Sequence, residues 1–134
     1  MKNILSEIRV LDFTRVLSGP YATRILADFG AQVIKVQSKK IEGTKPDNKG
    51  YFDTWNRNKR SISLDMSNSE ARKIALRLVA ISDVVIENFS PRVMSNWGMD
   101  YPKLKKTRSD IIMLSMSGMG RTGLWKDHVA FGPT

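Results

Sequence analysis

Residues 8–20 constrain the fold more than any other part of the 134-residue chain, because they read as a strand that runs directly into a helix. The first half is a nearly continuous apolar run, typical of a strand buried on both faces: Ile8, Val10, Leu11 and Phe13. Gly19 then turns the chain, and Pro20 suits a helix start because it needs no intrahelical partner for an N–H. Apolar residues continue at helical spacing up to Gly30, which is well placed to end the helix: Ala22, Ile25, Leu26 and Phe29. A helix that begins at the carboxyl end of a buried strand presents free N–H groups, a common place to bind an anionic ligand.

The remainder of the chain repeats this alternation of strand and helix. Residues 32–36 predict a second strand two residues after Phe29, the spacing of a parallel strand–helix–strand crossover. The capping-box pattern at residues 67–70 predicts a helix with an apolar stripe. Further strands are expected at 61–65, 84–86 and 110–116, and short helices at 91–97 and 101–107. Together they predict one α/β domain over residues 1–134, with a mostly parallel sheet and helices on both faces.

Composition narrows the possible functions. The absence of cysteine excludes disulfides and thiolate metal sites, and a single histidine argues against a His-based metal site or catalytic triad. No apolar run is long enough to cross a bilayer, and residues 1–7 lack the apolar core of a signal peptide, so we expect a cytoplasmic protein with no metal and no membrane partner. The net charge of +9 favours an anionic partner, but it fits a solubilising surface or the cationic part of a larger assembly equally well.

Two basic segments are candidate phosphate-binding regions. Residues 38–50 are polar and rich in turn formers, which predicts a flexible basic loop that is either solvated or closes its lysines over a phosphate. Residues 55–60 combine cations with an indole ring and two amides, a mixture that suits a nucleotide but is also found in a plain basic turn. The glycines at 118, 120 and 123 permit close approach of a ligand or a second chain, or simply a mobile loop.

Five motifs in order give the chain a close resemblance to the N-terminal part of the family III CoA-transferases, which include formyl-CoA transferase and carnitine CoA-transferase. The motifs are residues 10–16 with 18–20, 26–31 with 33–35, 58–62 with 64–65, 83–89, and 117–123. The resemblance covers nearly the whole chain. It implies a Rossmann-like domain, part of the family's large domain, that binds coenzyme A. Family members move CoA between carboxylic acids through aspartyl intermediates, and full-length members form interlocked dimers.

The resemblance also implies where CoA would bind. Carried over by position, the CoA-binding residues are Val16, Leu17, Ser38, Lys39, Lys40, Asn56, Arg57, Lys59, Asn88, Asn96 and Trp97. Some members have arginine where this chain has Ser38 and Asn96, and a lysine nearby does not reproduce the bidentate geometry of arginine.

The resemblance assigns no catalytic residue to this chain. The family's nucleophilic aspartate lies downstream of the last motif, and Asp127 precedes that region. Related acyl-CoA racemases use a histidine near the position that Phe131 occupies in this chain. Because a phenylalanine side chain transfers no proton, racemase chemistry is rejected.

Three hypotheses follow. The chain is the N-terminal part of a CoA-transferase, inactive alone, acting as a homodimer or with a complementary chain that carries the rest of the enzyme. Alternatively, it is a stand-alone CoA or acyl-CoA binding module. A basic nucleic-acid-binding domain is the least favoured alternative, through Arg57, Lys59, Arg60, Lys103, Lys105, Lys106 and Arg108. The first hypothesis predicts exposed apolar surface near residues 113–119 and 129–131.

Overall fold

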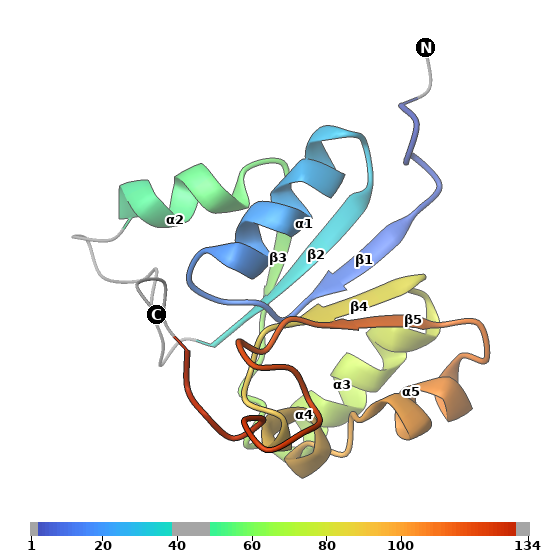
Figure 1. Ribbon diagram of the computed structural model, residues 1–134. Helices are drawn as coiled ribbons and strands as arrows, with labels where there is room; N and C mark the ends of the chain where they lie inside the picture. Colours follow the sequence, from blue (N-terminus) through green and yellow to red (C-terminus); the bar gives the residue numbers. More distant parts are fainter. Residues whose placement is uncertain (1–2, 39–48, 131–134) are drawn as a thin grey trace.

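The computed structural model describes residues 3–38 and 49–130 and shows a parallel sheet with helices on both faces (Figure 1). The elements in chain order are β1 (Arg9–Asp12), α1 (Ser18–Asp28), β2 (Gln32–Gln37), α2 (Lys49–Asn56), β3 (Arg60–Ser63), α3 (Ser69–Ala80), β4 (Val84–Glu87), α4 (Arg92–Asn96), α5 (Tyr101–Thr107) and β5 (Ile112–Ser115). Among the described residues, five strands pair in the order β3-β2-β1-β4-β5, all parallel. The predicted fold class is confirmed.

Alternation along the strands builds a core on each face of the sheet. Val10 and its neighbours in register, Val33 and Val84, point toward α1. Ala27 of α1, Ala31 between α1 and β2, and Ile86 of β4 complete the smaller core. Leu11 points the other way into the larger core, which contains side chains from α3, α4 and α5. Figure 1 shows the same division, with α1 on one face and α3, α4 and α5 on the other. Burial of the central strands on both faces explains their nearly continuous apolar sequences.

The ends of the helices agree with most of the signals in the sequence. Gly30 and Gly98 follow α1 and α4 with φ of 101° and 67°, the left-handed conformation that glycine adopts without strain. Helix α3 differs from its predicted start: the N-cap is Asn68, whose side chain accepts from the Glu70 N–H, rather than Ser67. The Ser67 hydroxyl instead donates to Asp65 at 2.6 Å, and the Ser67 N–H donates to the same carboxylate at 3.1 Å, so this residue belongs to the turn before the helix.

The second helix was not predicted. Helix α2 covers the last two residues of the 38–50 segment, which the sequence predicts to be a loop, and residues 51–56, for which the sequence predicts no helix or strand. Its composition is poor in strong helix formers, and it is stabilised by packing on α1, where Trp55 lies edge-on to Tyr21 with ring centroids 5.4 Å apart. Residues 39–48 of the predicted loop lie outside the described residues.

Apolar side chains are exposed at the β5 edge of the sheet, close to where the sequence predicted them. Ile112 and Leu114 are exposed on β5, and Met119 and Val129 are exposed beyond it. Phe131 lies outside the described residues. No helix in the described part of the chain is long and apolar enough to cross a membrane.

Leu104 on α5 provides a direct test of the larger core. It is fully buried, whereas Leu124 is 95% exposed. We expect Leu104→Ala to lower the free energy of unfolding by about 2–5 kcal/mol, because it removes buried methyl groups and leaves a cavity. The matched variant Leu124→Ala is expected to change it by less than about 0.5 kcal/mol. Denaturant unfolding measures both, and equal effects of the two variants would contradict this placement of α5.

Candidate functional site

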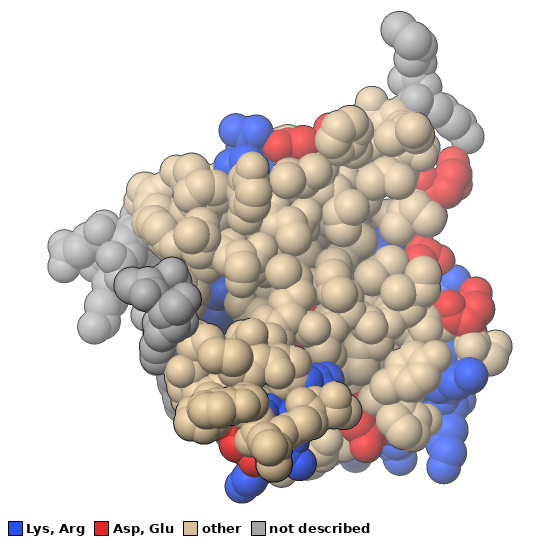
Figure 2. All heavy atoms as spheres, in the orientation of Figure 1, with Lys and Arg blue, Asp and Glu red and all other residues tan. Residues whose placement is uncertain are grey.

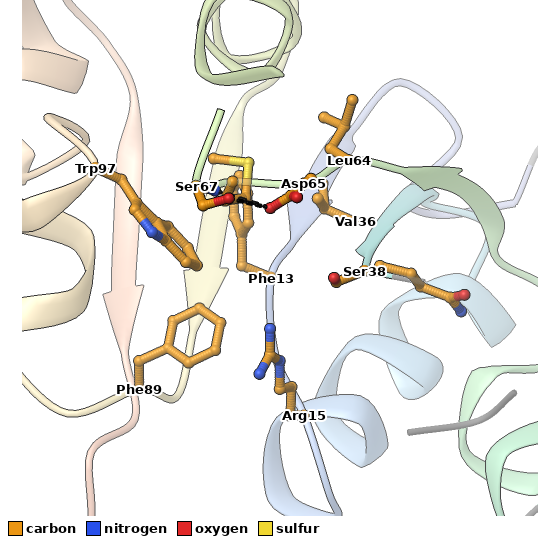
Figure 3. A pocket seen from close by; sticks show the side chains of 11 residues that line it. Phe13, Arg15, Val36, Ser38, Leu64, Asp65, Ser67, Phe89 and Trp97 are labelled. Atoms are coloured by element: carbon orange, nitrogen blue, oxygen red, sulfur yellow. Dashed lines mark hydrogen bonds between the residues drawn. The ribbon is translucent and has the colours of Figure 1, made fainter. Parts of the chain in front are cut away.

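A hollow of about 260 Å³ opens at the carboxyl edge of the sheet, where the loops after β1, β2 and β3 meet the segment around α4. It is lined by Phe13, Arg15, Val36, Gln37, Ser38, Leu64, Asp65, Met66, Ser67, Phe89 and Trp97. Figure 3 shows Phe89 and Trp97 on one side of Phe13 and Ser38 on the other. In open parallel sheets, ligands bind at this edge because the strand-to-helix loops gather there.

Aromatic rings form one wall of the hollow, and a cation lies beside them. Phe89 and Trp97 pack edge-to-face with centroids 5.2 Å apart, and Phe13 lies 6.2 Å from Trp97. The Arg15 guanidinium carbon is 5.0 Å from the centroid of the Phe89 ring. Ser67 and Asp65, joined by their hydrogen bond, add polar groups to the rim. This lining suits a planar, polar-edged ring next to an anionic group.

A buried ionic cluster lies beneath the loop that joins β1 to α1. The Asp12 carboxylate is fully buried and contacts two ammonium groups, that of Lys59 at 3.1 Å and that of Lys35 at 3.4 Å. Thr14 and Thr23 donate hydroxyl hydrogen bonds to the same carboxylate. The cluster therefore joins β1, β2, α1 and the segment before β3.

The cluster shifts the protonation of its members. Burial lowers the pKa of Lys59 from 10.5 to about 8, although the nearby Asp12 charge opposes the shift. Burial also lowers the pKa of Lys35, again against the attraction of Asp12. For Asp12, burial acts to raise the pKa, but the charges of both lysines and the threonine hydrogen bonds outweigh it, so its pKa lies below the ordinary value.

Several hydrogen bonds fix the loop from Phe13 to Arg15. The Thr14 N–H donates to Asp12 at 2.8 Å, and the Thr14 carbonyl accepts from the Lys35 ammonium. The Asn88 amide holds both polar backbone atoms of Arg15: its oxygen accepts from the Arg15 N–H at 2.8 Å, and its nitrogen donates to the Arg15 carbonyl at 2.7 Å.

Helix α1 starts immediately after this fixed segment. Val16 has a φ of 63°, a conformation that a β-branched residue rarely adopts. Within the described residues, no side-chain hydrogen bond caps the first turn of α1. Pro20 has no N–H and the Tyr21 N–H donates to the Leu17 carbonyl, so the N–H groups available to an anion are those of Ser18 and Gly19. Gly19 lets that turn pack closely, since an added Cβ would lie 2.2 Å from the Thr14 Cβ.

The structure brings together only some of the residues predicted to bind CoA. Ser38 and Trp97 line the hollow, and Val16 and Leu17 are exposed on the adjoining loop. Asn96 is exposed at the end of α4. Lys39 and Lys40 lie outside the described residues.

Other predicted residues have side chains engaged within the protein. The Lys59 ammonium contacts Asp12 and three other oxygens, those of Pro20, Thr23 and Asn56, at 2.7–2.9 Å. The Asn56 amide also donates to the Phe52 carbonyl, and Arg57 pairs with Asp28 at 2.8 Å on the surface. Direct contact of these residues with CoA stays a prediction.

Sequence reasoning missed Arg15 and Phe89 as parts of the site, although both lie in the motifs that carry the family resemblance. The signal that could have found them is their place just after β1 and β4, since neighbouring parallel strands end at the same edge.

The glycine-rich segment after β5 packs against the chain itself. Arg121 pairs with the buried Glu87 carboxylate at 2.9 Å and donates to the Pro91 carbonyl. A Cβ on Gly118 would lie 2.2 Å from the Cβ of Ala130. The close approach that Gly118 permits is therefore made by a later segment of the same chain. Within residues 3–38 and 49–130, no group of three or more His, Cys, Asp or Glu side chains is arranged to hold a metal.

The sequence profile described as CoA-transferase family III matches residues 5–134. The chain belongs to this family. It is 38% identical to the succinyl-CoA–L-malate CoA-transferase alpha subunit of Chloroflexus aurantiacus, a match that covers 95% of this chain and 32% of that protein. The succinate–glutarate CoA-transferase of Agrobacterium fabrum is 37% identical over 95% of this chain and 35% of its own length. The chain thus spans about a third of the length of the curated relatives it matches.

Solved structures agree with this assignment. A CAIB/BAIF family protein from Brucella suis superimposes with a TM-score of 0.91 and 34% identity, covering 98% of this chain and 38% of that protein. The parallel sheet and its carboxyl edge are therefore shared with a CAIB/BAIF family protein of known structure.

Lys59 makes the stability of the chain depend on pH in a defined direction. Because its pKa is lower in the folded chain, the unfolded chain binds more protons on this lysine between pH 8 and 10.5. The contribution of Lys59 to the free energy of unfolding therefore rises as pH increases through that window. Denaturant unfolding across the window should give a more positive slope against pH for the wild type than for Lys59→Met. Parallel curves would contradict the buried position of this ammonium.

Proposed function

We propose that this chain forms the CoA-binding part of an enzyme that transfers CoA between carboxylic acids. One observation carries the proposal: an aromatic hollow and the uncapped start of helix α1 lie next to each other at the carboxyl edge of the sheet, in a chain of CoA-transferase family III. CoA is a bipartite ligand of matching chemistry, because it combines a planar adenine with a pyrophosphate and a ribose phosphate.

The hollow offers the adenine a suitable environment. Phe89 and Trp97 supply apolar ring surfaces on which an adenine ring is able to pack while its edge meets Ser67 and Asp65. The Arg15 guanidinium, which lies over the Phe89 ring, adds a positive charge beside it. Ser38, at the end of β2, lies where some family members have an arginine, so this chain has a hydroxyl there instead of a bidentate phosphate contact.

The start of α1 offers the pyrophosphate free N–H groups and the positive end of the helix dipole. Arg15 contributes to the hollow, and Val16 and Leu17 follow it directly into the helix, so both parts of the proposed site belong to one short segment. A nucleotide placed in the hollow therefore has its phosphates within reach of the helix start.

We further propose that the chain is inactive alone. Transfer needs a carboxylate that reaches the thioester, together with groups that stabilise the oxyanion. The Asp12 and Glu87 carboxylates are buried and paired with basic side chains, so neither is free to attack a bound ligand. The nucleophile would come from the part of the family enzyme that this chain does not span.

The proposed partner is a second chain, either a copy of this one or a complementary subunit. Both the alpha and the beta subunit of the Chloroflexus aurantiacus succinyl-CoA–L-malate CoA-transferase match this chain, at 38% and 36% identity. This supports assembly from chains that each carry the domain described here. A cytoplasmic setting remains part of the proposal and is consistent with a sequence without cysteine.

Nucleic-acid binding is the weaker alternative, because several of the cations it needs are engaged elsewhere. Arg57 pairs with Asp28, Arg108 pairs with Asp83 at 2.7 Å, and Lys59 is buried against Asp12. The exposed lysines of α5 remain available, and Figure 2 shows basic side chains gathered over that part of the surface. They are Lys103, Lys105 and Lys106.

Calorimetric titration with CoA and acetyl-CoA, alongside a DNA duplex, tests the proposal at two salt concentrations. We expect saturable CoA binding that persists at the higher salt concentration, because stacking and helix N–H contacts depend less on salt than exposed ion pairs do. DNA binding through α5 would instead fall steeply with salt. Salt-sensitive DNA binding without CoA binding would overturn the proposed function.

A matched pair of variants locates the binding site. Trp97→Ala removes a ring from the wall of the hollow and should weaken CoA binding about tenfold, as expected for loss of a stacking ring. Trp125→Ala removes a 63% exposed indole from a segment that does not line the hollow and should leave the affinity unchanged. Equal effects of the two substitutions would place the adenine elsewhere.

A further inference from the structure

Val16 is a strained residue that connects two fixed segments, residues 13–15 and helix α1. A φ of 63° places a β-branched residue in the left-handed region, which persists only where the surrounding structure enforces it. On its C-terminal side, the carbonyl of Leu17 accepts from the Tyr21 N–H at 2.8 Å as helix α1 begins. On its N-terminal side lies Arg15, whose backbone is held by the side chain of the residue that directly follows β4.

The group that holds Arg15 is the amide of Asn88. Asparagine suits this position because its side chain carries both an acceptor and a donor, which match the N–H and the carbonyl of one residue. The preceding residues are fixed as well: the Phe13 N–H donates to the Ile86 carbonyl, and the Thr14 carbonyl accepts from Lys35. Because Arg15 is fixed on one side and α1 on the other, the backbone of Val16 makes the change of chain direction between them.

The conformation of Val16 sets the direction in which α1 leaves the end of β1. A left-handed residue reverses the local course of the chain, so relaxing Val16 to an extended conformation would turn the helix start away from Arg15 and the hollow. The strain is thus located where the two proposed subsites of one ligand are joined.

We propose that Asn88 is a positioning residue that keeps Val16 in its left-handed conformation, so that Arg15 and the start of α1 face the same CoA molecule. The proposal rests on the proposed function. It differs from the contact expected from the family resemblance, because Asn88 acts here through the backbone of Arg15 and not by touching the ligand.

Four proteins test the proposal: the wild type, Asn88→Ala, Val16→Gly and the double variant. Glycine adopts a positive φ without strain, so in Val16→Gly residue 16 no longer needs Asn88 to keep it in the left-handed conformation. We expect Asn88→Ala alone to weaken CoA binding about tenfold, and to weaken it by less than about threefold when Val16→Gly is also present. As a control, Val129→Gly replaces an exposed valine outside the site and is made with and without Asn88→Ala. In this control background, Asn88→Ala should weaken CoA binding as much as it does in the wild type.

Thermal unfolding of the same proteins provides a readout without ligand. Asn88→Ala should lower Tm by several degrees in the wild-type background and by clearly less in the Val16→Gly background. Coupling in both Tm and CoA affinity supports the proposal. If Asn88→Ala lowered CoA affinity equally in the wild-type and Val16→Gly backgrounds, the proposal would be overturned, and direct contact of Asn88 with the ligand would be indicated.

The two readouts also separate this inference from the proposed function. If the wild-type chain bound no CoA, the proposed function would fail, and the positioning of CoA would fail with it. If the wild-type chain bound CoA but neither readout showed coupling between positions 16 and 88, only the role assigned to Asn88 would be overturned.

Discussion

The buried carboxylate of Asp12 is the interaction on which the arrangement of the site depends. It lies at the end of β1 and contacts ammonium groups from β2 and from the segment before β3, while Thr23 joins it to α1. Removing one partner from such a buried pair leaves an uncompensated charge and commonly costs about 3–5 kcal/mol. The cluster therefore fixes the relative positions of four segments whose loops meet at the carboxyl edge of the sheet.

The same cluster influences the electrostatics of the proposed phosphate site. When Lys35 and Lys59 are both protonated, two positive charges face one negative charge beneath the loop from β1 to α1. The excess positive charge and the start of α1 act in the same direction, because both favour an anion at the end of β1. At the proposed phosphate site, Lys59 thus favours an anion from inside the protein, with its side chain buried.

The sequence predicts the fold well because the signals for the sheet are local. The apolar runs of β1, β2 and β4, the glycine after α1 and the apolar stripe of α3 each predict their own element. Helix α2 escaped prediction because its stability comes from Trp55 packing on Tyr21, a contact across 34 positions of chain that no local pattern contains.

The site is only partly predictable, for a related reason. Residues following β1 and β4 are expected at one edge of the sheet, but the sequence does not show what each side chain contacts there. Lys59 is predicted to bind phosphate beside Trp55, and no local pattern shows that its ammonium contacts Asp12, 47 positions away. Asn88 is predicted to contact the ligand, and no local pattern shows that its amide binds the backbone of Arg15 across 73 positions.

The central claim, that CoA binds across the hollow and the start of α1, is tested most directly by mapping CoA-induced shift changes in the ¹H–¹⁵N spectrum of the labelled chain. The structure predicts the largest changes at residues 13–19, 64–67 and 88–97, with the amides of α5 unaffected. Changes concentrated on α5, or no changes at a saturating CoA concentration, would contradict the account.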